Sequence, residues 1–205
     1  MAKDPLLTGK AGRIDLIEVP QMAYFAADGV GAPGCDAYIA AVEALYTVAY
    51  GARFHGKALG HDQKVGPLEG LWWADDMRAY TEGRRDDWKW TMLIRAPSWL
   101  DVETLEALRA KAIAKRRDKP ATAQALAALI MMDLTEGTCL QALHLGPYAD
   151  EAPLIARMHN DAMPAQGLQP TGLHHEIYLS DPRRVAPEKL KTLIRQPVRR
   201  IGAPT

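Results

Sequence analysis

The chain has 205 residues, with 25 basic and 25 acidic side chains and a hydrophobic fraction of 48%. A neutral chain lacks the basic footprint of a nucleic-acid binder, and no apolar run reaches the roughly 18 residues of a membrane span. The first ten residues hold no apolar segment of a signal peptide, and the two cysteines form no disulfide pattern. The composition therefore predicts an ordinary soluble, cytoplasmic, globular protein.

Hydrophobic periodicity, capping residues and turn residues predict a mixture of strands and helices. In chain order we expect strands at 14–19 and 22–27, a helix over 36–53, strands at 67–73 and 88–95, helices over 101–119 and 120–128, strands at 129–134 and 138–145, a helix over 148–163, a strand at 172–179 and a last helix over 188–195. Glu136-Gly137 is expected to turn a hairpin between the strands that flank it.

The order strand, Gly/Pro turn, helix, strand occurs twice. This predicts an α+β fold built from a duplicated β-α-β-β module, in a single domain over 1–205 with pseudo-repeats at about 14–117 and 129–198. Each module is expected to lay its helix on one sheet face. The opposite faces are then expected to flank a groove. Such a groove is the expected ligand site, because ligands favour the interfaces between modules.

The strand at 172–179 carries Glu176 and Tyr178 on one face, together with His174, and an apolar set on the other. A carboxylate in mid-strand requires an explanation, and two remain open. Glu176 is either a salt-bridged structural group or a functional one. Buried, it would become a usable base near neutral pH, and ionised it would attract a cationic ligand.

The adjacent residues Trp72 and Trp73 point to opposite sheet faces, so at most one of them is expected to line the groove. Trp73 is preferred, because its face also carries Glu69. Trp90 and Met92 share a face and are expected to form another wall, with core packing as the equally supported alternative. An indole ring can cover an apolar ring or a cation.

Tyr148 follows Gly-Pro at the start of a predicted helix, and Tyr24 is its counterpart in the first module. His174 and His175 are adjacent and point to opposite faces, and the other histidines show no metal-ligand spacing. We therefore expect no metal and no cofactor. Because no serine or cysteine lies in a nucleophile motif, covalent acyl chemistry is not expected either.

Several segments together resemble the GyrI-like small-molecule-binding family, in its stand-alone branch without a DNA-binding domain. They are PLEGLWW at 67–73, EG at 136–137, HLGPY at 144–148, HHEIYLSDP at 174–182 and the tail at 187–198. The resemblance extends from about residue 15 to 198 and implies the same duplicated fold. It also implies a groove for amphipathic or cationic small molecules around a strand glutamate, which is Glu176 here. Some stand-alone members are implicated as hydrolases of cyclopropane-containing electrophiles.

The resulting hypothesis is a protein that binds a hydrophobic or cationic small molecule, with hydrolysis of a strained electrophile as its sharper form. Glu176 would activate water and Tyr178 would orient it. The predicted ligand-binding residues are Trp73, Trp72, Trp90, Glu69, Tyr148, Tyr24, Met92 and His144. Two alternatives stay open, a non-catalytic drug-sensing or sequestering module and an inhibitory partner of DNA gyrase. The partner is expected to be a small molecule, without nucleic acid or membrane, and the protein a monomer or homodimer.

Overall fold

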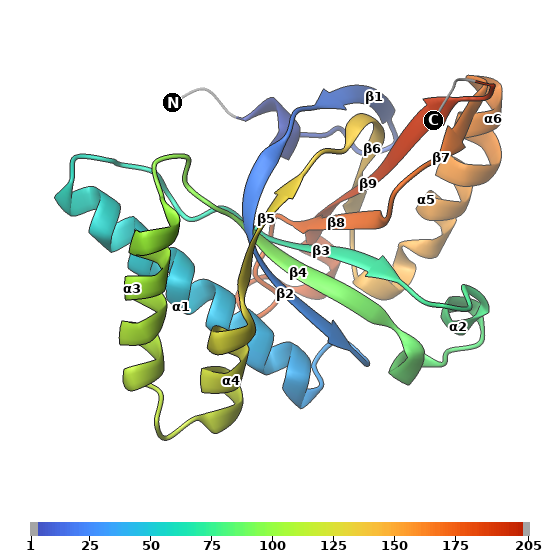
Figure 1. Ribbon diagram of the computed structural model, residues 1–205. Helices are drawn as coiled ribbons and strands as arrows, with labels where there is room; N and C mark the ends of the chain where they lie inside the picture. The colour runs from blue at the N-terminus through green and yellow to red at the C-terminus, as the bar shows by residue number, and fades with distance from the viewer. Residues whose placement is uncertain (1–3, 203–205) are drawn as a thin grey trace. The chain divides into compact units, whose positions relative to one another are not determined.

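The computed structural model describes residues 4–202, which fall into two compact units. The terminal unit consists of the chain up to Gln21 together with the chain from Thr135 onward, and the central unit runs from Met22 to Leu134. Each unit contains an antiparallel sheet and helical segments (Figure 1). The predicted α+β class is therefore confirmed. The assignment of one domain with repeats at 14–117 and 129–198 stays a prediction.

In the central unit the strands lie in the order β3-β4-β2-β5. Their bounds are β2 Met22–Val30, β3 Leu68–Trp73, β4 Lys89–Arg95 and β5 Ile130–Leu134, and the helices are α1 Asp36–Ala58, α2 Arg78–Thr81, α3 Val102–Ala114 and α4 Pro120–Ala128. The helix α1 packs on β2 and β4, and α3 and α4 pack on α1 (Figure 1). The order β2-α1-β3-β4 is the predicted strand–helix–strand–strand module.

In the terminal unit the strands lie in the order β1-β6-β9-β8, with β7 also paired to β9. Their bounds are β1 Ile14–Val19, β6 Gly137–Leu145, β7 Leu168–Pro170, β8 His174–Tyr178 and β9 Lys191–Arg200. The module order recurs as β6, helical segment, β8 and β9.

The helical segment of the terminal unit is broken where the sequence predicted one continuous helix. It consists of a 3-10 turn Tyr148–Asp150, α5 Ala152–Arg157, a π-helical turn Met158–Ala162 and α6 Met163–Ala165. Pro164 has no N–H to continue the α-helical ladder, which explains the wider turn just before it. Three 3-10 turns elsewhere span Pro5–Leu7, Arg85–Asp87 and Pro187–Lys189.

The predicted helix over 188–195 is wrong, because residues 191–195 form the first half of β9 and Pro187–Lys189 forms only a 3-10 turn. The strand lies between β6 and β8, and both of its faces are buried from Thr192 to Val198. The alternation of polarity that marks a half-exposed strand is therefore absent. Pro197 is tolerated because the β8 pairing ends at Arg195 and the β7 pairing begins at Val198.

The predicted hairpin at Glu136-Gly137 is also wrong. The strand before it, β5, pairs with β2 in the central unit, whereas β6 pairs with β1 and β9 in the terminal unit. Gly137 has a φ of 65°, so the turn itself needs glycine. The turn thus marks a passage between the two units.

Within the residues described, no helix is both long and apolar enough to cross a membrane.

Candidate functional site

Glu176 lies on the side of its sheet that the helical segment covers. Its partner across the β8–β9 ladder is Ile194, whose own partner on β6 is Ala142, and directly opposed residues share a face. Both apolar residues belong to the core cluster that packs against Met158 and Met163. The groove was predicted on the sheet face opposite the helix, whereas Glu176 lies on the helix side.

Two neighbours on β8 hold the Glu176 carboxylate. The Tyr178 hydroxyl donates to Oε2 at 2.9 Å, and the His174 Nε2 lies 3.3 Å from Oε1. The side chains of His174 and Glu176 are 17% and 16% exposed, so solvent or a ligand can reach the carboxylate. The period of two along a strand predicted this shared face, and the contacts confirm it.

Tyr148 extends this group of side chains from the turn that precedes α5. Its ring meets the Tyr178 ring edge to face, with centroids 5.5 Å apart and planes at 78°. Burial raises the pKa of Tyr148 to about 12, with help from the negative charges of nearby carboxylates, so the phenol keeps its proton. The His144 Nε2 lies 3.0 Å from the Pro147 carbonyl oxygen, where it fixes the Gly-Pro turn that carries Tyr148.

Glu151 is a second carboxyl group in this cluster, and sequence reasoning missed it. The residue is 4% exposed, and its Oε1 is buried without a hydrogen-bond partner among the residues described. Burial, and then the charge of Glu176, raises the pKa of Glu151 to about 8, while Thr192 opposes the rise. At neutral pH Glu151 is therefore mostly the neutral acid. Glu151 follows Tyr148 by three residues at the start of a helical segment, and residues at this spacing are neighbours on a helix. This spacing was the signal from which its place beside Tyr148 could have been predicted.

The pKa of His159 lies below its ordinary value, because the ring is half-buried and because His174 adds positive charge nearby. The imidazole of His159 is therefore neutral at physiological pH. It lies in the π-helical turn, near enough to His174 of β8 to experience its charge.

The opposite face of β8 carries a buried ionic network. Glu136 is bonded to the His175 Nδ1 at 2.9 Å and to the Arg195 Nη1 at 2.8 Å, and Arg195 also donates to Gln141. Burial opposes ionisation of Glu136, but its bonds to His175 and Arg195 outweigh that effect and lower its pKa. This network explains the buried His175 as a structural group. Among residues 4–202 no set of three or more His, Cys, Asp or Glu residues is arranged to hold a metal ion.

The central unit gathers aromatic rings beneath α1. Tyr38 of α1 stacks on Trp72 at 6.3 Å and meets Trp90 edge to face at 5.5 Å, and Trp72 also contacts Trp88 at 6.2 Å. Trp90 and Met92 are fully buried. The structure therefore places Trp72, Trp90 and Met92 on the helix side of this sheet.

Trp73, Glu69 and Tyr24 lie on the other side of the same sheet. The Tyr24 hydroxyl donates to the Glu69 Oε2 at 3.2 Å, and both residues are buried. Trp73 shares this face with Glu69 as predicted, and is half-buried. The tryptophan on the helix side is thus Trp72. Trp73, which was preferred for lining the groove, lies on the face away from the helix. The roles of these residues in ligand binding stay predictions.

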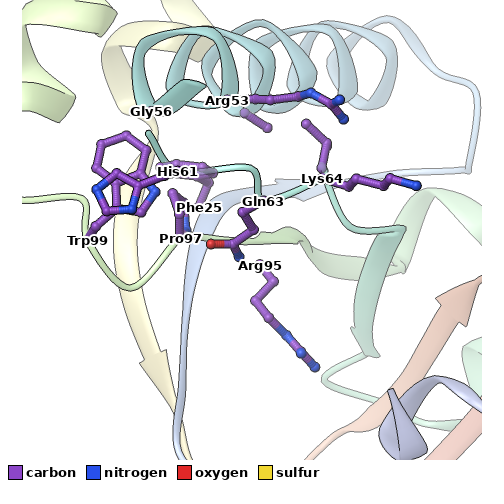
Figure 2. Close-up of a pocket in the computed structure, with 11 residues that line it drawn as sticks. Phe25, Arg53, Gly56, His61, Gln63, Lys64, Arg95, Pro97 and Trp99 are labelled. Carbon is purple, nitrogen blue, oxygen red and sulfur yellow. The ribbon is translucent and has the colours of Figure 1, made fainter. Parts of the chain in front are cut away.

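A small hollow lies beside the C-terminal half of α1, within the central unit (Figure 2). Its volume of about 20 Å³ suits about one water molecule. Trp99 stacks on His61 at 5.1 Å along one wall, and Arg53, Lys64 and Arg95 also line the hollow, with their charged ends extending away from that wall. None of the predicted site residues lines this hollow.

The fold and the site together define a class: a duplicated α+β protein in which a strand carboxylate lies among aromatic side chains. Residues 13–199 match the GyrI-like small molecule binding domain. The chain therefore belongs to the GyrI-like family of small-molecule-binding domains, as the sequence motifs predicted.

Solved structures agree with this assignment. An uncharacterized conserved protein from Listeria innocua is 35% identical, with a TM-score of 0.82 over 92% of this chain and 93% of that one. A hydrolase from Listeria innocua is 34% identical, with a TM-score of 0.77 over 95% of each chain. The EcmrR C-terminal domain shares the fold alone, at 9% identity and a TM-score of 0.56 over 92% of this chain and 98% of that one. No curated protein matches the chain.

Proposed function

We propose that this chain is a small-molecule hydrolase that opens strained, cyclopropane-containing electrophiles, with Glu176 as the general base. The observation that carries the proposal is the Glu176 carboxylate, held by Tyr178 at 2.9 Å and His174 at 3.3 Å while it remains partly exposed. An oriented carboxylate in reach of solvent can take a proton from an attacking water.

A strained ring needs modest assistance, because its breaking bond already carries strain. A positioned general base accelerates a reaction on the order of 10²–10⁴-fold. One carboxylate in a binding site is therefore sufficient for useful catalysis of such a reaction. Tyr178 and Tyr148 supply aromatic surface beside the base. Structures of 34% and 33% identity whose proteins are described as hydrolases support the proposal.

The test is incubation with a cyclopropane-containing electrophile, followed by mass spectrometry of the small molecule. Wild type is compared with Glu176→Gln and with Glu188→Gln, an exposed carboxyl of the same unit that serves as a matched control. We expect a mass gain of one water in wild type and in the control, and its loss in Glu176→Gln. Full turnover by Glu176→Gln would refute the role of the base.

Tyr178→Phe keeps the ring against Tyr148 and removes the hydrogen bond to Glu176. A bond to a charged group is worth about 1.5–3 kcal/mol, so turnover is expected to fall by about 10–100-fold. Ligand that binds wild type but returns unchanged would instead establish a sequestering or sensing module without chemistry.

A further inference from the structure

The position of Glu151 is tightly fixed by the backbone. Its N–H donates to the Tyr148 carbonyl at 3.2 Å, and its own carbonyl accepts from the Leu154 and Ile155 amides of α5, each at 3.0 Å. The residue is only 4% exposed, and its Oε1 is buried. Glu151 therefore enters the cluster from the same turn that presents Tyr148.

The contacts of its neighbours bring Glu151 toward the Glu176 group. Tyr148, three residues earlier, contacts the Tyr178 ring, and Thr192, which acts on Glu151, lies directly across the β8–β9 ladder from Tyr178. Glu151 also experiences the charge of Glu176. The two carboxyl groups thus approach the same part of β8, one from the strand and one from the helical segment.

The surroundings of the two carboxyl groups differ. Glu176 has a hydroxyl and an imidazole at its oxygens, whereas the Glu151 Oε1 has no partner in the described part of the chain. A buried carboxyl with a free oxygen is costly if its only purpose is structural, since an apolar side chain would fill the space at lower cost. Two carboxyls in contrasting surroundings are the arrangement in which one serves as base and the other as acid.

We propose that Glu151 is the general acid of the reaction, a neutral carboxyl that gives its proton to the oxygen on which negative charge develops as the strained ring opens. This inference rests on the proposed hydrolase function and adds a second catalytic residue to it. The step applies to a cyclopropane conjugated to a carbonyl, because that carbonyl oxygen is the proton acceptor.

The step balances without any further reactant. Glu176 takes a proton from water, and the hydroxyl oxygen forms a bond to a cyclopropane carbon as one ring C–C bond breaks. The electron pair of that bond moves through the conjugated system to the carbonyl oxygen, which takes the proton of Glu151. Glu176 then holds one proton and Glu151 none, and exchange with solvent restores both groups. The net change is the addition of one water.

The proposal predicts a distinct pH profile. The groups that face Glu151 are Glu176 from β8, Tyr148 from the preceding turn and the uncharged Thr192 from β9. Burial and the charge of Glu176 raise the pKa of Glu151 to about 8, so wild-type turnover is expected to fall as the pH rises through about 8. The Tyr148 phenol, with a pKa of about 12, remains protonated throughout this range.

The experiment measures turnover of a carbonyl-conjugated cyclopropane from about pH 6 to about pH 9.5 in wild type, Glu151→Gln and Asp150→Asn. Asp150 is the adjacent, exposed carboxyl and carries the same chemical change, so it is the matched control. Glu151→Gln is expected to lower kcat by about 10²–10⁴-fold, to leave the dissociation constant of the ligand unchanged, and to lose the decline above about pH 8.

Each outcome has a separate meaning. Wild type that binds the electrophile without adding water overturns the proposed function and the general acid with it. Wild type that turns over while Glu151→Gln stays within about threefold and keeps the high-pH decline overturns the general acid alone. Should Glu151→Gln fail to fold, the carboxyl ¹³C resonance of Glu151 in wild type decides, because titration near its ordinary value of 4.5 would refute a neutral acid.

Discussion

Replacing Glu151 by glutamine is expected to change how stability depends on pH. The pKa of Glu151 is about 8 in the folded protein, against an ordinary value of 4.5, because of burial and the charge of Glu176. A group with a raised folded pKa contributes stability that is complete below its unfolded pKa and is lost as the pH rises through its folded pKa. Wild type should therefore lose stability between about pH 4.5 and about pH 8.

The magnitude follows from the width of that window. One proton is worth about 1.4 kcal/mol per pH unit, so wild type should lose about 3 kcal/mol between pH 5 and pH 7.5 through this group. Glutamine has nearly the same shape and no titration. The free energy of unfolding of Glu151→Gln, relative to wild type, should rise by about 3 kcal/mol over the same interval.

Urea unfolding at the two pH values measures this difference. All five tryptophans lie in the central unit, so far-UV circular dichroism is a better probe of the terminal unit than tryptophan fluorescence. Asp150→Asn should unfold with the pH dependence of wild type. If the difference between Glu151→Gln and wild type changes by less than about 0.5 kcal/mol, the account of a buried neutral carboxyl is refuted.

Three further results are expected. Glu136→Gln should lower the free energy of unfolding by about 3–5 kcal/mol, measured in urea, because Arg195 stays buried without its charge partner. Gly29→Ala should destabilise by about 1–3 kcal/mol in thermal unfolding, since its Cβ would overlap the Trp90 ring. The pKa of Cys139 is raised to about 12, chiefly by burial, so a thiol reagent should leave it unmodified until urea exposes it. Rapid native labelling of Cys139 would contradict the last expectation.

Local chemistry explains why much of the fold could be predicted from the sequence. Strands with one dominant pattern, such as β3 and β8, and helices with a cap, such as α3 behind Asp101, follow from short-range rules. The Asp101 side chain accepts from the Thr104 amide at 2.8 Å, as a capping residue should. These features need only neighbours along the chain.

The strand β9 escaped prediction for the opposite reason. Arg195 and Gln196 look like exposed positions in the sequence, yet both are buried and bonded to distant residues. Arg195 reaches Glu136, and Gln196 donates to the Thr171 carbonyl at 2.8 Å. These polar residues can occupy a buried strand because their hydrogen-bond partners lie far along the chain. A local sequence pattern contains no information on such partners.

The site also combines features set by the local sequence with features set by distant residues. Alternation along one strand was enough to place Glu176 and Tyr178 on a common face, because that geometry belongs to the strand itself. Glu151 was missed because a glutamate at a helix start is ordinarily a solvated residue near the positive end of the helix dipole. Its burial arises only when the helical segment packs against the sheet, through the core cluster that joins Met158 and Met163 to Ile194.

The sequence by itself determined the family motifs, most of the helices and strands, and the shared face of Glu176 and Tyr178. Only the tertiary structure decided that β1 pairs with β6, that β5 pairs with β2, that Glu176 lies on the helix side of its sheet, and that Glu151 is buried with a raised pKa. The physical reason is that backbone geometry is set by residues next to each other, whereas strand partners, burial and proton affinity are set by residues that folding brings together.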